Sequence, residues 1–518
     1  MLSTLLRRGS RGLSSAACQV VPKAATAPQT QFSHIVRFEK EQPEDIMSQV
    51  PDVNYYVFSE ALENPYKDVP MNEQVDFDIG QPQMKAGKME FSKLENGLRV
   101  ASIDRQGLTS QLAIVVNTGA RFEGPDDIGV SDMVKMMAFS STAHLSHLRT
   151  VKTIEAMGGT ASCQVGREHL IYHCETLREF MPISATLLVG NVLFPRLLEW
   201  EVNAVRQQWE DGKIPKPATD QLIDDLVHQT AFHNNTLGRS IWATESSAER
   251  FTPENIRGFM LKHFSMDKCA FVGVNVDHKE LTTWLARAFA EYTPVQPSGS
   301  VVTKPLYTGG YLIRESADSH GQAHVALAFP TEGWNSRDLI PSTVLQVLLG
   351  GGGSYSTGGP GKGMHSRLYL DVLNTKHYVD HCLAFNSVSS DAGLFGITLS
   401  GAGKDAPKLI QAAADQMGKL NKFSAEELQR AKNMLKANMF ASSENGKAVA
   451  EDAGRQVIMA GKYVSPVEFA ALIDAVTEAD LIALSQRILA NPVTMVVYGD
   501  VTHAPHITQV QKLFEKKK

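Results

Sequence analysis

The residues with the clearest chemical potential form a glycine-rich run at residues 350–363, where eight of fourteen positions are glycine. Ordering so many glycines is costly in backbone entropy, so a run of this kind either moves or lets a ligand approach the backbone closely. We therefore interpret it as a segment that either moves or admits a ligand, with Lys362 as a solvated charge within it. Its candidate binding residues are Gly350, Gly351, Gly352, Gly353, Gly358, Gly359, Gly361, Lys362 and Gly363.

The spacing of this run allows two other interpretations to be weighed. A phosphate-binding loop needs glycine six residues before its lysine and Ser or Thr directly after it, whereas Ser356 and Gly363 occupy these positions. Nucleotide binding is therefore disfavoured. A flexible linker is the better alternative, but the run lies between two expected helices, 343–349 and 364–373, inside one half of the chain.

Histidine pairs are the other candidate site. His144 and His147 are three residues apart, and His169 and His173 are four apart in a strand-like stretch, where that spacing separates the rings too far for one metal ion. No acidic or cysteine co-ligand is evident for either pair. We interpret all four as ordinary surface or core histidines. The zinc-peptidase motif His-x-x-Glu-His occurs nowhere in the chain.

Three segments together resemble one peptidase family. The stretch from Gly350 to Asn374, GGGGSYSTGGPGKGMHSRLYLDVLN, resembles the signature loop of the alpha subunits of mitochondrial processing peptidase, non-catalytic members of the pitrilysin-like M16 family. Residues 117–123 (NTGARFE) and 137–142 (MAFSST) are similar to the segments that flank the zinc motif of that family. The resemblance covers roughly residues 93–518, and the glycine-rich run is its most specific part.

The resemblance also implies where a zinc site would be. Active members of the family bind zinc through the two histidines of His-x-x-Glu-His and a distal glutamate, while the Glu of the motif activates a water. Aligned on Met137, the corresponding positions here are Asp132, Lys135 and Met136, with Gln208 at the distal position. Lys135 places a cation where active members have their general base, and the thioether of Met136 is a poor ligand for zinc in this kind of site. We expect a degenerate site, with no catalytic residue, metal or other cofactor in this chain.

By the same resemblance, the chain is expected to be the substrate-recognition subunit of a metalloendopeptidase. It would hold presequence peptides for a catalytic beta subunit, in which the zinc is expected. Its location would be the mitochondrial matrix, or the matrix side of the inner membrane as part of respiratory complex III beside other subunits of that complex. The alternative is a purely structural core subunit of the ubiquinol–cytochrome c reductase complex. Lys135 and Met136 argue against an independently active protease.

The elements that must position these residues repeat once along the chain. Residues 97–103 and 111–116 alternate like strands, and 311–313 and 324–329 take their place in the second half. Each half then ends in the same way. A threonine, Thr252 or Thr477, precedes a helical pattern, and a buried strand pattern follows that helix. The repeat predicts an α+β fold of two homologous domains. The resemblance adds that each domain is a mainly antiparallel sheet packed against helices, as in M16 peptidases.

The N-terminus has the composition of a targeting segment. Residues 1–31 are rich in Ser and Ala and contain four basic residues but no acidic one, which is typical of a mitochondrial transit peptide. Cleavage is expected near residues 13/14. The expected division of the chain is the transit peptide and a flexible tail at 1–31, a proline-broken extension at 32–92, a domain with the degenerate zinc motif at 93–300, and a domain with the glycine-rich run at 301–518.

Composition and charge exclude several classes of protein. A formal net charge of −6 argues against nucleic-acid binding and suits a cationic peptide ligand. No apolar run approaches the roughly 20 residues that a bilayer span needs, so no direct membrane span is expected. The five cysteines lie far apart without a Cys-x-x-Cys pair, which argues against a disulfide framework and against a zinc knuckle. They are expected to be free thiols in a reducing compartment.

Overall fold

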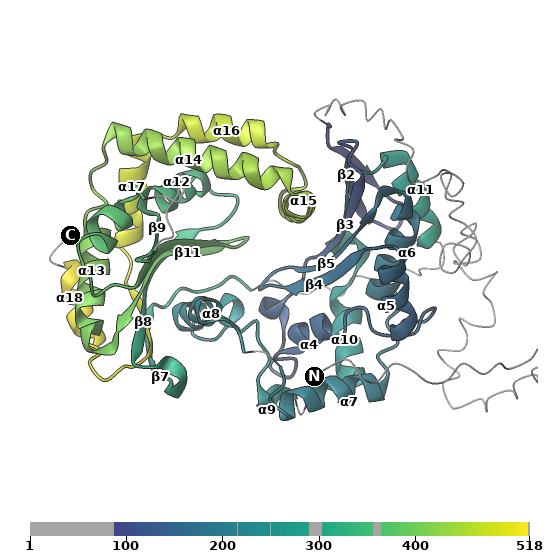
Figure 1. The fold of residues 1–518 in the computed structure, drawn as a ribbon, viewed down its shortest axis with the longest axis horizontal. Coiled ribbons are helices and arrows are strands. Elements are labelled where there is room, and N and C mark those ends of the chain that lie inside the picture. The colour runs from purple at the N-terminus through teal and green to yellow at the C-terminus, as the bar shows by residue number, and fades with distance from the viewer. Residues whose placement is uncertain (1–86, 215, 249, 290–302, 356–363, 516–518) are drawn as a thin grey trace, which may run out of the picture. The chain divides into compact units, whose positions relative to one another are not determined.

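The computed structural model describes residues 87–515 except for 215, 249, 290–302 and 356–363. The first half of the described chain forms a six-stranded sheet with helices against it (Figure 1). Its strands are β1 (Glu90–Lys93), β2 (Arg99–Ile103), β3 (Thr109–Val116), β4 (Thr160–Val165), β5 (Leu170–Leu177) and β6 (Cys269–Val274). Its α-helices are α4 (Val130–Met136), α5 (His147–Ala156), α6 (Met181–Leu193), α7 (Glu199–Glu210), α8 (Thr219–Ala231), α9 (Glu245–Ala248), α10 (Pro253–His263) and α11 (His278–Ala288).

The second half forms another six-stranded sheet, also with helices against it (Figure 1). Its strands are β7 (Gly310–Glu315), β8 (Gln322–Glu332), β9 (Gly351–Gly353), β10 (His381–Val388), β11 (Ala392–Ala402) and β12 (Thr494–Gly499). Its helices are α12 (Leu339–Leu349), a π-type turn η6 (Tyr369–Leu373), α13 (Ala406–Gly418), α14 (Ala425–Glu444), α15 (Gly446–Ala460), α16 (Pro466–Ala475), α17 (Glu478–Leu489) and α18 (Ile507–Glu515).

The two sheets share one topology. The first sheet has the strand order β1-β2-β6-β3-β5-β4 and the second has the order β7-β12-β8-β11-β10-β9. When the extra edge strands β1 and β9 are left out, the two orders match, with β2 corresponding to β7, β6 to β12, β3 to β8, β5 to β11 and β4 to β10. Each sheet has one parallel pair, β2 with β6 in the first and β7 with β12 in the second, and all other pairs of the named strands are antiparallel. The predicted pair of homologous α+β domains is therefore confirmed. Strand β1 (Glu90–Lys93) crosses residues 92/93, where the boundary between the N-terminal extension and the first domain was expected.

The ends of the two halves match as the sequence predicts. The Thr252 side chain caps α10 by accepting the N–H of Asn255, and the Thr477 side chain caps α17 in a reciprocal capping box with Asp480. Each cap satisfies backbone donors that the first turn of a helix leaves free. The buried strands β6 and β12 follow, and each pairs with a strand on both sides.

Each sheet is covered on one face by a helix from the other half of the chain. Helix α15 of the second half packs Val449, Ala450, Ala453 and Val457 against apolar residues of β2, β3 and β6. In the same way, helix α8 of the first half packs against the sheet of the second half, on apolar residues of β8, β11 and β12. The described residues accordingly belong to one compact unit, Val53–Lys518. No helix in the described ranges is both long and apolar enough to span a membrane.

Candidate functional site

Helix α4, which carries the degenerate motif, is held at its first turn by the buried Glu123. The Glu123 carboxylate accepts the backbone N–H groups of Gly129 at 2.8 Å and Ser131 at 2.9 Å. Gly129 has a φ of 85°, and a Cβ there would lie 2.9 Å from Ser247 Oγ, so glycine is required. Burial raises the pKa of Glu123 to about 7, although the two N–H groups favour the ionised form. Glu123 thus holds the start of α4 in place.

Asp132 and Lys135 lie one turn apart on α4 and form an ion pair with each other. The Asp132 side chain is only 3 % exposed, and its Oδ2 also accepts the N–H of Ala243 at 3.0 Å. The Lys135 ammonium lies 5.0 Å from the centroid of the Trp242 ring. The carboxylate is therefore neutralised by a cation from its own helix, which would repel a metal ion bound beside it. These residues do not fit a zinc ion.

The other two motif positions do not join this pair. Met136 packs against the apolar core of the first half, and Gln208 is exposed on α7, where its neighbour Trp209 faces the core instead. Over the ranges that the structure describes, no three His, Cys, Asp or Glu side chains gather in a way that could hold a metal ion. The ion pair thus acts as a structural link between α4 and the loop that contains Trp242 and Ala243.

The histidine pairs are separated by the fold. Helix α5 begins at His147, so His144 precedes it and packs edge-on against Phe194, with ring centroids 5.6 Å apart. His173 lies within β5, whereas His169 precedes that strand. Burial lowers the pKa of His169 and of His173 to about 4, so both rings are neutral near pH 7.

The glycine-rich run begins as a strand, which the sequence did not predict. In β9, Gly351, Gly352 and Gly353 pair antiparallel with residues 381–383 of β10. Gly351 has a φ of 114°, and a Cβ there would lie 2.0 Å from the main-chain oxygen of Cys382, so only glycine allows the two strands to approach. Five of the candidate binding residues, Gly358, Gly359, Gly361, Lys362 and Gly363, lie outside the described residues.

Contacts on both sides anchor this segment. On one side, α12 leads directly into Gly350, whose carbonyl accepts the N–H of Ala384 at 2.9 Å. On the other, Ser366 Oγ accepts the N–H of Gly351 at 3.1 Å. The following residue, Arg367, donates to both carboxylate oxygens of Glu427, from Nε at 2.6 Å and from Nη2 at 2.9 Å. The glycine segment is therefore attached to α12, β10 and α14.

A buried charge cluster joins the two halves, and sequence reasoning missed it. The Arg121 guanidinium pairs with Glu168 in the first half and with both oxygens of Asp391 in the second, at 2.8 and 2.6 Å. Glu168 also accepts the N–H of Ser390 at 2.8 Å. Arg121 belongs to the NTGARFE segment, but nothing in the sequence indicates a partner 270 residues later.

His228 makes a second polar contact between the halves that the sequence did not indicate. It lies on α8, where its Nδ1 is 2.8 Å from the main-chain oxygen of Asp224 and its Nε2 is 3.0 Å from Ser387 Oγ on β10. Burial and the nearby Arg167 lower the pKa of His228 to about 4. A neutral ring with Nδ1–H donating to the carbonyl satisfies both contacts.

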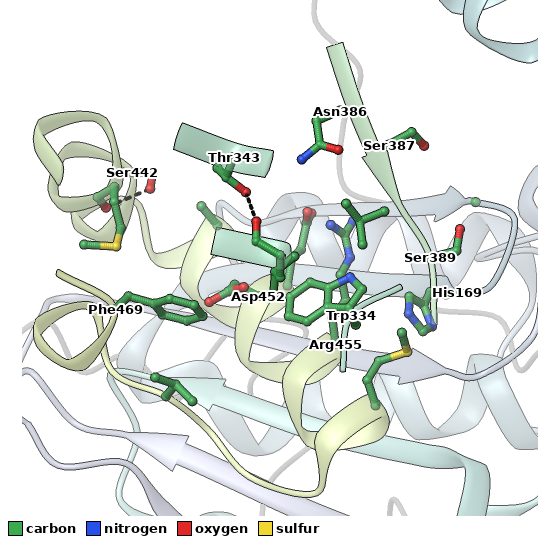
Figure 2. Close-up of a pocket in the computed structure, with 18 of the residues that line it drawn as sticks. His169, Trp334, Thr343, Asn386, Ser387, Ser389, Ser442, Asp452, Arg455 and Phe469 are labelled. Atoms are coloured by element: carbon green, nitrogen blue, oxygen red, sulfur yellow. Dashed lines mark hydrogen bonds between the residues drawn. The ribbon is translucent and has the colours of Figure 1, made fainter. Parts of the chain in front are cut away.

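A cavity of about 930 Å³, partly open to solvent, lies between elements of both halves (Figure 2). Its walls come from the β4–β5 hairpin, α12, β10, α14, α15 and α16, and none of the four degenerate motif residues lines it. In the view of Figure 2, the side chain of Asp452 lies between the rings of Phe469 and Trp334. This volume falls within the range of ligand-binding sites.

Comparison with known proteins is consistent with this architecture. Residues 99–245 match the family described as insulinase (peptidase family M16), and residues 250–435 match the family described as the peptidase M16 inactive domain. A mitochondrial-processing peptidase subunit alpha from Solanum tuberosum is 32 % identical over 463 residues, 87 % of this chain and 90 % of that relative. The protein of the same name from Homo sapiens is 28 % identical over 449 residues, 83 % of this chain and 85 % of the relative.

Proposed function

The chain belongs to the M16 (insulinase) peptidase family, and from this premise we propose that it is a non-catalytic substrate-recognition subunit of the mitochondrial processing peptidase type. In this role it binds presequence peptides and presents them to a zinc-bearing beta partner, in mitochondria. The relatives named as alpha subunits of that peptidase support this assignment.

The observation that carries the proposal is the ion pair of Asp132 with Lys135. At the two positions where an active family member would have a metal ligand and a general base, this chain has a carboxylate and an ammonium that neutralise each other. Metal-assisted hydrolysis needs an open metal position and a base that can take a proton from water. The proteolytic step is therefore assigned to a partner chain.

The glycine segment supports the recognition role. Its described residues are anchored between α12 and β10, with glycine required for the close strand contact at Gly351. A structural subunit without a ligand has no need for eight glycines at residues 350–363. A backbone without side chains lets an extended peptide approach closely.

The first test is to extract the protein gently from mitochondria and identify its partners by native electrophoresis and mass spectrometry. We expect co-migration with a chain that carries His-x-x-Glu-His. The isolated assembly should then cleave presequences, and deletion of residues 358–363 should abolish that cleavage. Co-migration with cytochromes b and c1, without any cleavage of presequences, would instead identify a structural subunit of complex III and refute the proposal.

A further inference from the structure

Three large apolar side chains are exposed on three helices of the first half, α5, α7 and α10. Leu148 is 63 % exposed, Trp200 64 % and Leu261 56 %. The three helices lie on the side of the first sheet away from α15 (Figure 1), and α7 and α10 turn other residues, among them Val202 and Phe259, into the core. A single exposed leucine is ordinary on a protein surface, but an exposed tryptophan leaves one of the largest apolar side chains in water.

Hydrogen bonds to Ser141 hold the starts of α5 and α7 beside each other. Ser141 Oγ accepts the N–H of His147 at 3.1 Å and donates to the Glu201 carboxylate at 2.6 Å. Leu148 directly follows His147 in the sequence, and Trp200 directly precedes Glu201. The two exposed apolar residues are thus each one position away from a residue that is bound to the same hydroxyl.

Two further hydrogen bonds attach α10 to this junction. Arg196 donates its backbone N–H to the main-chain oxygen of Ser141 at 2.9 Å, and Arg257 Nη2 donates to the main-chain oxygen of Arg196 at 2.9 Å. Leu261 lies one turn beyond Arg257, so the two residues share one face of α10. We call the surface formed by Leu148, Trp200 and Leu261 with Lys152, Arg196 and Arg257 the helical patch.

Basic residues outnumber acidic ones around the helical patch. Within four positions of its three apolar side chains the sequence has two acidic residues, Glu199 and Glu201, and five basic ones: Arg149, Lys152, Arg196, Arg257 and Lys262. Glu201 is buried in its hydrogen bond, which leaves Glu199 as the exposed acid of this set, and Glu155 and Glu254 lie one turn further out. The patch is therefore locally basic, although the chain has a formal net charge of −6.

This combination of side chains matches the two layers of an anionic bilayer surface. Tryptophan prefers the boundary between lipid headgroups and acyl chains, and leucine side chains enter the same boundary from amphipathic surface helices. Lysine and arginine keep their charges among the headgroups, where anionic lipids attract them. A protein partner is the other surface to consider, but protein interfaces are depleted in lysine, whereas Lys152 and Lys262 are both exposed here.

We propose that the helical patch docks this protein on the surface of a bilayer that contains anionic lipids. Trp200, Leu148 and Leu261 enter the boundary below the headgroups, and Lys152 and Arg196 pair with lipid phosphates. The contact is peripheral and reversible, because it uses surface side chains and needs no spanning helix. It concerns where the protein is held, so it does not depend on the recognition role proposed above.

The test uses the full chain assembled with its partner and measures co-sedimentation with lipid vesicles. We expect the assembly to bind phosphatidylcholine vesicles that contain roughly 30 mol % phosphatidylglycerol, to release them as the salt concentration rises, and to ignore pure phosphatidylcholine. Lys152→Gln combined with Arg196→Gln should weaken binding roughly thirtyfold, since each basic residue near an anionic surface contributes about fivefold. Lys422→Gln combined with Arg430→Gln removes the same two charges from exposed positions outside the patch and should change nothing.

Fluorescence quenching tests whether Trp200 itself enters the bilayer. The other four tryptophans of the chain are buried or half-buried, so brominated phosphatidylcholine in the anionic vesicles should quench mainly Trp200. Trp200→Phe keeps an apolar ring and should retain most of the binding while losing this quenching. Trp200→Ser should weaken binding roughly tenfold, because a large apolar side chain no longer leaves water.

Each outcome bears on the docking surface or on the proposed function separately. Equal binding of the wild type and the Lys152→Gln, Arg196→Gln variant to anionic vesicles overturns lipid docking, and so does quenching that persists in Trp200→Phe. Binding to native mitochondrial membranes but to no lipid vesicle would identify an acidic protein surface as the partner, which also overturns it. Cleavage of presequences without vesicles should be equal in the wild type and the patch variants, and a wild-type assembly that fails to cleave refutes the proposed function whatever the vesicles show.

Discussion

The guanidinium of Arg121 and the carboxylate of Asp391 form a two-point ion pair between the first and second halves of the chain, with N–O distances of 2.8 and 2.6 Å. Arg121 also pairs with Glu168, whose side chain is 8 % exposed, and donates to the main-chain oxygen of Thr303 at 2.9 Å. The pair lies at the end of the hairpin that joins β10 to β11. One side chain thus connects the segment before α4 to the strand that forms a wall of the cavity.

Replacing Arg121 should destabilise the fold strongly. Arg121→Met leaves the buried carboxylate of Glu168 without a cationic partner, and removal of one member of a buried ion pair costs about 3–5 kcal/mol. The melting temperature should fall by several degrees, and limited proteolysis should separate the two halves. Arg178→Met is the matched control, because its pair with Asp104 is more than 30 % exposed on both sides and contributes about 1 kcal/mol or less. Equal effects of the two variants would contradict a structural role for Arg121.

The packing of α15 on the sheet of the first half can be tested at one glycine. A Cβ on Gly454 would lie 2.4 Å from Val115 Cγ2, so Gly454→Ala should destabilise the protein by about 1–3 kcal/mol through overpacking. A Cβ on Gly258 of α10 would meet nothing within 4 Å, so Gly258→Ala should stabilise it by about 0.5–1 kcal/mol. Thermal and urea denaturation measure both changes, and a stabilising Gly454→Ala would mean that α15 is not seated against β3.

The glycine segment offers a similar pair of neighbouring residues. Gly351→Ala forces a Cβ to within 2.0 Å of the Cys382 carbonyl at a positive φ, whereas a Cβ on Gly352 has open space around it. We expect Gly351→Ala to raise the KM for presequence cleavage roughly tenfold, as 1–3 kcal/mol of backbone strain displaces β9. Gly352→Ala should leave the KM nearly unchanged. Steady-state cleavage by the assembled complex measures both, and equal values would remove β9 from substrate binding.

The buried His228 should make stability depend on pH. Its folded pKa of about 4 lies below the ordinary value of 6.5, so the unfolded chain takes up a proton first as the pH falls. The stability that the neutral ring contributes is therefore complete above pH 6.5 and is lost as the pH falls toward 4, by about 3 kcal/mol. Melting temperatures measured from pH 8 to pH 5 should fall less steeply for His228→Gln than for the wild type. Parallel profiles would show that His228 does not titrate in this way.

The sequence signals on which the candidate site was predicted are local. The substitution of Lys135 and Met136 into a zinc-motif position is visible in a few residues, and so is the density of glycine at 350–363. Where sequence reasoning fell short, the missing information was spatial. Gly351 forms a strand because β10 lies beside it, and residues 350–355 alone carry no strand periodicity.

The sequence alone determined the repeat of the two halves, the threonine caps of their last helices and the loss of the zinc-motif residues, because periodicity, capping and residue type are properties of short segments. Only the tertiary structure decided which partners meet across the chain. The pairing of Arg121 with Asp391, the exchange of α8 and α15 between the sheets, and the cavity with Asp452 all join segments that lie far apart in the sequence. Such contacts depend on how whole sheets and helices pack, and burial and close packing select them only after the elements have formed.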